Sequence, residues 1–236
     1  MPVLQLVKDF IGLFYPEVCI CWGEDLVAKE EYVCTMCIFK LPKTNFHKTI
    51  DNPLAKVFWG RAELASVAAY CHYRKGNTVQ DIVHEIKYNG KKELGNYIGQ
   101  CYGQDLKGSE LFNSVDAIVY IPLHPKKLRK RGYNQSACFA EGLSESMNVP
   151  VLHDALSRVK NTDTQTRKTR YERWENVEGI FKVEMVEELR GKHVLLVDDV
   201  ITTGSTIEAC AQELIKADVG KVSVAAIGCA DTINSI

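Results

Sequence analysis

Two adjacent carboxylates, Asp198 and Asp199, follow an apolar run at 194–197 and precede a short stretch rich in hydroxyl groups. The apolar run is typical of a buried parallel strand, and a helical pattern begins at about Ile207. A strand, a small loop and a helix N-terminus in this order can bind a phosphate, because free backbone N–H groups and the helix dipole point at the anion. The members of the predicted loop are Thr202, Thr203, Gly204, Ser205 and Thr206. A capped helix with two solvated aspartates is the plainer alternative.

Four cysteines near the N-terminus form two close pairs, Cys19 with Cys21 and Cys34 with Cys37. A structural zinc site uses such paired thiolates, and the metal replaces a core that is too small to fold alone. The spacing therefore predicts a bound zinc ion.

The first of these pairs departs from the usual Cys-x-x-Cys spacing, because Trp22 occupies the expected second position. Cys19-x-Cys21 still chelates a metal if the turn adjusts. One alternative is that one of the two is not a ligand and that His47 or another group replaces it. The other is a knuckle with free thiols that Trp22, Tyr32 and Phe39 hold together.

Basic residues gather after a second predicted strand at 116–122, where five of the six residues in 126–131 are Lys or Arg. We expect a cationic loop at the carboxyl end of this strand, on the same side of the sheet as the two aspartates. Arg131 is the residue we expect to contact a polyanionic ligand, because arginine makes bidentate contacts with phosphate groups. A basic surface loop or a DNA-binding patch is the alternative.

A smaller basic spot lies at Lys87, Lys91 and Lys92, at the junction of two predicted helices. The first helix begins at Asn77 or Thr78, and the second follows the Asn-Gly turn and runs to about Tyr102. We interpret Lys91 and Lys92 as a solvated helix end and keep Lys87 as a candidate ligand residue.

The remaining chain adds a strand at about 65–72, a helix at 135–147, a long polar stretch at 155–181 and a strand at 221–228. A polar loop of that length in a compact domain is typical of a functional segment. Residues 1–14 have the spacing of a short amphipathic helix that packs on the body.

The composition is that of an ordinary soluble globular protein, with 236 residues, 46% hydrophobic and 25% charged. The net charge of −1 gives no argument for nucleic acid or membrane binding. No apolar run reaches the length of a membrane span, and the N-terminus lacks the basic region of a signal peptide. Nine cysteines, an odd number, favour a reducing cytoplasm over a disulfide framework.

The stretch 194–206 resembles the phosphoribosyl pyrophosphate (PRPP) motif of type I phosphoribosyltransferases. The whole chain resembles the ComF family, which is linked to DNA uptake by competent bacteria. Besides 194–206 and the cysteine knuckle, the residues that carry this resemblance are Lys87-Tyr-x-Gly90, Pro122-Leu-His-Pro125, Arg131-Gly-Tyr-Asn-Gln135, 160–165, Arg170 and 176–181. The departure from the family pattern is Cys19-x-Cys21.

The resemblance implies an α/β type I phosphoribosyltransferase fold, a mainly parallel sheet flanked by helices, with a zinc-knuckle-like appendage. We expect residues 1–48 to form the N-terminal helix and knuckle, and residues 49–236 to form the phosphoribosyltransferase-like domain. The family implies that Asp198 and Asp199 hold the ribose hydroxyls, that 202–206 wraps the 5′-phosphate, and that Mg²⁺ binds with PRPP. The polar stretch would close over the site and exclude water.

Three functions are consistent with this resemblance. The first is Mg²⁺-dependent transfer of a 5-phosphoribosyl group with release of pyrophosphate, to an acceptor that the sequence does not specify. A glutamine-dependent amidotransferase is not expected, because the chain begins Met1-Pro2 and lacks an N-terminal cysteine nucleophile and glutaminase domain. The second is a PRPP-regulated protein that binds single-stranded DNA through the knuckle and the bases at 126–131 and 160–173. The third is that the knuckle docks a partner such as a competence helicase.

Overall fold

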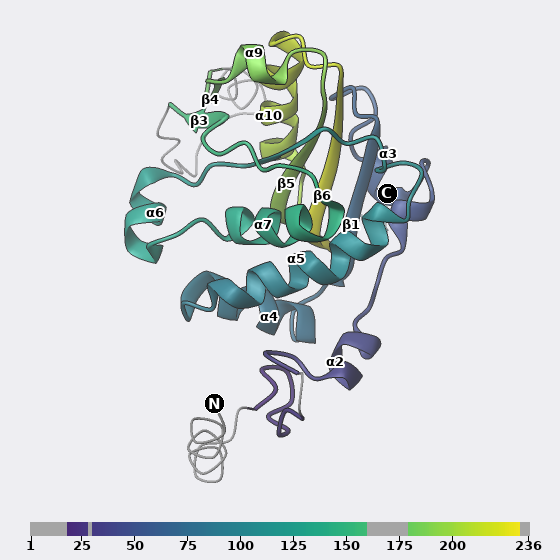
Figure 1. Ribbon diagram of the computed structural model, residues 1–236, viewed down its shortest axis with the longest axis vertical. Helices are drawn as coiled ribbons and strands as arrows, with labels where there is room; N and C mark the ends of the chain where they lie inside the picture. The colour runs from purple at the N-terminus through teal and green to yellow at the C-terminus, as the bar shows by residue number, and fades with distance from the viewer. Residues whose placement is uncertain (1–17, 28–29, 160–178, 232–236) are drawn as a thin grey trace.

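Four parallel strands form the main sheet in the order β1-β6-β5-β2. Figure 1 shows β5, β6 and β1 side by side. The structure is a computed structural model and describes residues 18–27, 30–159 and 179–231. Helices pack on both faces of the sheet, so the strands are almost entirely buried, as is usual for parallel sheets. The strands are β1 (Ser66–Tyr73), β2 (Ala117–Tyr120), β5 (His193–Ile201) and β6 (Lys221–Ala230). The predicted α/β fold with a mainly parallel sheet flanked by helices is confirmed.

One face of the sheet is covered by α4 (Thr78–Tyr88), α5 (Lys92–Lys107) and α7 (Gln135–Met147). Glycines let α5 and α7 approach closely: a Cβ on Gly142 would lie 1.9 Å from the carbonyl oxygen of Asn96. The long helix α5 is therefore fixed against α7 by backbone contact as well as by side chains. The expected helix end at about Tyr102 is too early, because the pattern of buried residues continues to Leu106.

The other face of the sheet is covered by α10 (Ser205–Lys216) and by smaller elements that surround it. Alternate residues of β5 point to opposite faces, so Leu195 and Val197 pack with the first layer, while Val194 and Leu196 pack with the second. The smaller elements are α3 (Pro53–Lys56), the antiparallel pair β3 (Leu156–Arg158) and β4 (Phe181–Val183), and α9 (Val186–Leu189).

The described part of the knuckle includes the short helix α2 (Thr35–Lys40), and a 3₁₀ turn, η1 (Phe46–Lys48), follows it. Cys19 and Cys37 are buried in the same hydrophobic cluster as α4 and α5. Trp22 and Phe39 are exposed, at 58% and 83%, and so do not hold the knuckle together, whereas Tyr32 packs against the core cluster. The division at residue 48 stays a prediction.

Two predicted loops are partly helical in the structure. The basic residues at 126–131 belong to α6 (Pro125–Arg131), because His124 caps its N-terminus, Pro125 occupies its first turn and Gly132 ends it at φ +80°. Ser205 and Thr206, predicted in the phosphate loop, form the first turn of α10, and the loop itself is 202–204. The predicted N-cap at Asn77 is confirmed, since its side chain accepts a hydrogen bond from Gln80 N–H.

The expected N-terminal helix at 1–14 and the central part of the predicted closing loop, 160–178, lie outside the described residues. None of the helices in the described ranges combines the length and the apolar character that crossing a membrane requires.

Candidate functional site

Asp198 and Asp199 lie inside β5 and not beyond its end, which corrects the expected strand boundary. The strand continues because β6 is long enough to pair with it through Ile201, opposite Cys229. Asp198 Oδ1 accepts hydrogen bonds from the backbone N–H of Asp199 at 2.8 Å and from Ser136 Oγ at 3.1 Å. The acids are thus held by backbone pairing near the carboxyl end of the sheet, where open α/β folds bind ligands.

The electrostatic state of Asp198 is unusual for an aspartate. Burial, followed by the neighbouring charge of Asp199, raises the pKa of Asp198 from its ordinary value of 3.8 to about 7. The hydrogen bonds from Asp199 N–H and Ser136 Oγ oppose this rise. A ligand that brings hydroxyl groups or a cation to this carboxylate would favour its ionised form.

Lys87, the candidate ligand residue of α4, lies beside the acid pair. Its Nζ is 3.0 Å from Asp199 Oδ2, and both side chains are largely buried. The last turn of α4 brings Lys87 to this point, 112 positions away from Asp199 in the sequence. An amine at this distance neutralises part of the negative charge that two adjacent carboxylates would otherwise accumulate.

The loop at 202–204 leads from β5 into the N-terminus of α10. Gly204 is the residue before the helix, with φ +76°, and it has no side chain that could cap the first backbone N–H groups. The hydroxyls of Thr203 and Ser205 lie 3.2 Å apart, and both residues are exposed. Thr202 and Thr206 are exposed as well. These residues form a polar helix N-terminus whose dipole favours an anion.

A cationic cavity of about 430 Å³ adjoins the acid pair through Lys87. The guanidinium of Arg131 lies over the Tyr88 ring, 5.4 Å from its centroid, and Arg131 Nη1 donates a hydrogen bond to Gln135 Oε1. Arg131 and Lys87 therefore share one cavity, although the element that carries Arg131 is a helix and not a loop. The lining residues are Lys87, Tyr88, Gly90, Lys127, Lys130, Arg131 and Tyr133.

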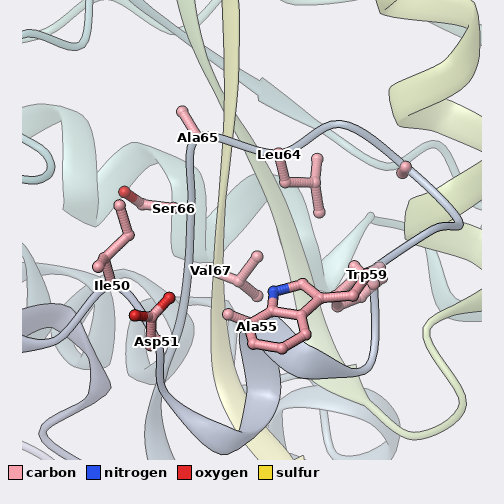
Figure 2. Close-up of a pocket in the computed structure, with 10 residues that line it drawn as sticks. Ile50, Asp51, Ala55, Trp59, Leu64, Ala65, Ser66 and Val67 are labelled. Atoms are coloured by element: carbon pink, nitrogen blue, oxygen red, sulfur yellow. The ribbon is translucent and has the colours of Figure 1, made fainter.

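A second cavity, of about 210 Å³, lies between the first residues of β1 and the segment that precedes them (Figure 2). Its walls include Trp59, Leu64 and Val67, and among the described residues that line it Asp51 is the only ionisable one. None of the predicted site residues lines it. This cavity does not provide the charge that a phosphorylated ligand requires.

The cysteine knuckle brings three of its four predicted ligands together. The sulfurs of Cys19, Cys34 and Cys37 all lie within 4.8 Å of one another, and the sulfurs of Cys19 and Cys37 are 3.6 Å apart. Backbone N–H groups of Cys34 and Cys37 donate to the sulfurs of Cys19 and Cys34, at 3.3 and 3.4 Å. This three-sulfur cluster could hold a metal ion.

The fourth predicted ligand, Cys21, lies near the cluster but outside this three-sulfur group. Burial first, and then the charge of Cys19, raises the pKa of the Cys21 thiol to about 12. At Cys19 burial also acts to raise the pKa, but backbone hydrogen bonds, with that of Cys34 the strongest, lower it to about 7. His47, the alternative ligand, is buried elsewhere, against the ring of Tyr102 with the ring centroids 6.0 Å apart.

Two residues near the site were not predicted from the sequence. Ser136 lies in the first turn of α7, directly after the N-cap Asn134 and Gln135. A hydroxyl group at this position is the sequence feature that could have marked it as a site residue. Arg61 donates to the carbonyl oxygen of Thr203 at 3.0 Å and had no local signal, because nothing in residues 57–65 marks a ligand motif.

Comparison with known proteins matches the part of the chain that holds the acids and the loop. The family model described as "Phosphoribosyl transferase domain" matches residues 134–229. These residues run from the start of α7 into β6 and include neither Lys87 nor Arg131.

Three curated proteins illustrate the similarity over longer stretches. The DNA utilization protein YhgH of Escherichia coli is 27% identical over 199 residues, which cover 83% of each chain. Competence protein F of Haemophilus influenzae is 34% identical over 122 residues, 51% of this chain and 53% of that protein. Competence protein ComFC of Bacillus subtilis is 25% identical over 213 residues, 81% of each chain.

Proposed function

This chain is a ComF-family, phosphoribosyltransferase-like protein, and we propose that it binds PRPP with Mg²⁺ between β5, α10 and the cationic cavity. In this proposal it transfers the 5-phosphoribosyl group, and pyrophosphate leaves from the anomeric carbon. The observation that carries the proposal is the acid pair Asp198–Asp199, placed between Lys87 and the N-terminus of α10.

The phosphate and ribose ends of PRPP fit the loop and the acids. The 5′-phosphate would accept hydrogen bonds from the backbone N–H groups of Gly204, Ser205 and Thr206 and from the hydroxyls of 202–206. The ribose hydroxyls would donate to Asp198 and Asp199, which fixes the sugar with its anomeric carbon toward the cationic cavity. The hydroxyls would also favour ionisation of Asp198, which burial disfavours in the free protein.

The pyrophosphate end would lie in the cationic cavity. Arg131 would make bidentate contacts with it, while Lys87 would move from Asp199 toward the leaving group as charge develops there. The chemistry suits Mg²⁺, because this ion binds through one or two carboxylates together with substrate phosphates. Asp198 and Asp199 would supply the carboxylates, and the bound ion would reduce the charge of the departing pyrophosphate.

The test of this function is the double variant Asp198→Asn with Asp199→Asn. We expect it to fold and to lose measurable PRPP binding in calorimetry with Mg²⁺, because neither amide accepts from the ribose diol as strongly as a carboxylate. Unchanged affinity would contradict the proposal. Incubation of the unchanged protein with PRPP, Mg²⁺ and a panel of bases and amines then identifies an acceptor by pyrophosphate release. Tight binding without turnover on any acceptor would favour a binding protein over an enzyme.

The knuckle would hold a structural zinc ion in the same proposal. Cys19, Cys34 and Cys37 would supply three thiolates, and Cys21 would supply the fourth after a small side-chain movement. The backbone N–H bonds to Cys19 and Cys34 support this assignment, because such bonds stabilise the thiolate form that zinc requires. Metal analysis of protein purified without chelator should find about one zinc per chain.

A second candidate function, single-stranded DNA binding, has support from the surface of the knuckle. Trp22 and Phe39 expose aromatic rings, and Lys40 Nζ lies 4.4 Å from the Trp22 ring centroid. Exposed rings beside basic groups are typical of sequence-tolerant binding to single strands. The competence and DNA-utilization names of the relatives agree with this role. Binding should weaken steeply with salt, and oligonucleotide titrations at two salt concentrations test it.

A further inference from the structure

Arg61 joins the phosphate loop to a part of the chain outside the matched family region. It lies in the 53–62 segment, which begins with α3 and continues through turns to Ala62. The family model matches only 134–229, so no residue of this segment belongs to it. Phe58 nevertheless packs directly against Gly204: a Cβ on that glycine would lie 2.7 Å from two atoms of the ring.

The guanidinium of Arg61 makes four hydrogen bonds that connect the segment, the loop and α10. Nη1 donates to the carbonyl oxygens of Thr203 at 3.0 Å and Val57 at 3.1 Å. Nε and Nη2 donate to Glu208 Oε2 at 3.1 and 2.6 Å. In return, Gln212 of α10 donates to the carbonyl oxygen of Arg61 at 3.1 Å. A planar guanidinium can satisfy three acceptors of this geometry at once, and an ammonium group cannot reproduce that fork.

The bond to Thr203 determines which way the loop presents its backbone. The Thr203–Gly204 peptide is trans, so its carbonyl and its N–H point in opposite directions. Because Arg61 holds the carbonyl on its own side, the N–H of Gly204 points away from Arg61. That N–H is the first of the donors that an anion at the N-terminus of α10 would use.

The bond to Glu208 removes a charge that would otherwise oppose anion binding. Glu208 lies in the first turn of α10, and its side chain is only 18% exposed. An uncompensated carboxylate at this depth would repel a phosphate at the same helix end. The ion pair with Arg61 cancels this repulsion.

The other side of the 53–62 segment combines core contacts with an exposed tryptophan: Leu54 and Ala55 are buried in the cluster that includes Val67. Trp59 is 62% exposed, and together with Ala55 and Ala62 it borders the cavity of about 210 Å³ (Figure 2). Its printed contacts with the loop come from Val57 and Phe58, which pack against Gly204, and from Arg61, which donates to Thr203.

We propose that Arg61 is a positioning residue for phosphate binding, which orients the Thr203–Gly204 peptide and neutralises Glu208. This inference rests on the proposed function, because it concerns the loop assigned to the 5′-phosphate. It also assigns part of the anion site to a segment outside the residues that the family model matches.

The experiment compares R61Q and R61K with the unchanged protein by calorimetry, using ribose 5-phosphate and inorganic pyrophosphate as separate probes with Mg²⁺. We expect R61Q to bind ribose 5-phosphate about tenfold more weakly and pyrophosphate with unchanged affinity. R61K keeps the positive charge but loses the planar set of donors. Its affinity for ribose 5-phosphate should therefore lie between that of R61Q and that of the unchanged protein. The variant R190Q, which removes an exposed ion pair with Glu187, is the matched control and should bind both probes normally.

Each outcome decides the proposal. Unchanged ribose 5-phosphate affinity in both Arg61 variants would overturn it, and so would an equal loss of both probes, which indicates a general structural defect. If R61Q does not fold, R61K carries the same comparison. Failure of the unchanged protein to bind ribose 5-phosphate would instead overturn the proposed function, and this inference with it. In the double variant R61Q with E208Q, part of the lost affinity should return, because the uncompensated carboxylate is gone.

Discussion

Replacement of Asp198 by Asn should make the free protein more stable at neutral and alkaline pH. The pKa of Asp198 is raised from 3.8 to about 7 by burial and by the charge of Asp199. Between about pH 4 and pH 7 the folded state therefore binds a proton that the unfolded state has lost, so the free energy of unfolding falls as pH rises through this window. Asn has no proton to lose, and its Oδ1 can keep both hydrogen bonds that Asp198 Oδ1 accepts.

The size of this effect follows from the same pKa. One pKa unit corresponds to about 1.4 kcal/mol. The full shift therefore limits the gain in the free energy of unfolding above pH 7 to about 4 kcal/mol. Water that reaches a half-buried carboxylate reduces such a penalty, and we expect a gain of roughly 2 kcal/mol at pH 8. For a domain of this size that gain raises the melting temperature by about 4–8 °C. At pH 4 the gain should vanish, since both side chains are then neutral.

The assay is thermal and urea unfolding of both proteins at pH 4, 6 and 8, with EDTA present and without PRPP. Asp199→Asn is the matched control. It removes the negative charge beside Asp198, but it also removes the ion pair with Lys87, whose Nζ lies 3.0 Å from Asp199 Oδ2. Its gain should be smaller than that of Asp198→Asn or absent. An equal gain for Asp198→Asn at pH 4 and pH 8, or none at pH 8, would refute the electrostatic reasoning.

Three further changes test other parts of the molecule. Arg131→Gln should weaken pyrophosphate binding by about tenfold and leave ribose 5-phosphate binding unchanged in calorimetry, because Arg131 lines only the cationic cavity; equal losses for both ligands would contradict this division. Cys34→Ser should lower the zinc content well below that of the unchanged protein and lower the melting temperature, as measured by metal analysis and calorimetric scans; a full zinc complement would remove Cys34 from the ligand set. Gly142→Ala should cost about 3 kcal/mol in urea unfolding, because its Cβ would lie 1.9 Å from the carbonyl oxygen of Asn96. Gly108→Ala, where the nearest atom is 3.8 Å away, is the matched control and should change stability little.

The proposed site shows how far local patterns reach. The acids, the loop and α10 occupy one continuous stretch, 198–216, so the strand, the positive φ at Gly204 and the helix start were all encoded by neighbouring residues. Even there two boundaries were wrong. The end of β5 depends on the length of β6, and the start of α10 depends on Gly204, which can serve as the residue before the helix.

The basic run at 126–131 carries local helix signals that contradict the predicted loop. Proline at the first turn and glycine after the last residue are helix signals, and α6 obeys both. The predicted position of this charge, at the edge of the sheet that carries Asp198 and Asp199, agrees with the structure. The predicted loop conformation is wrong, because the residues form a helix. In the knuckle, the spacing predicted that four cysteines lie together, and the structure groups Cys19, Cys34 and Cys37. The spacing could not show that Cys21 lies outside this group of three sulfurs.

The sequence by itself determined the features that depend on contiguous residues: the parallel α/β character, the acid pair, the strand-loop-helix order around Gly204 and the paired cysteines. Only the tertiary structure decided which distant residues complete them. Lys87 reaches Asp199 because α4 packs on one face of the sheet, and Arg61 reaches Thr203 across 142 positions because α3 and α10 share the other. Backbone propensities act over a few residues, whereas these partners are selected by how the layers pack, and no pattern along the chain records that choice.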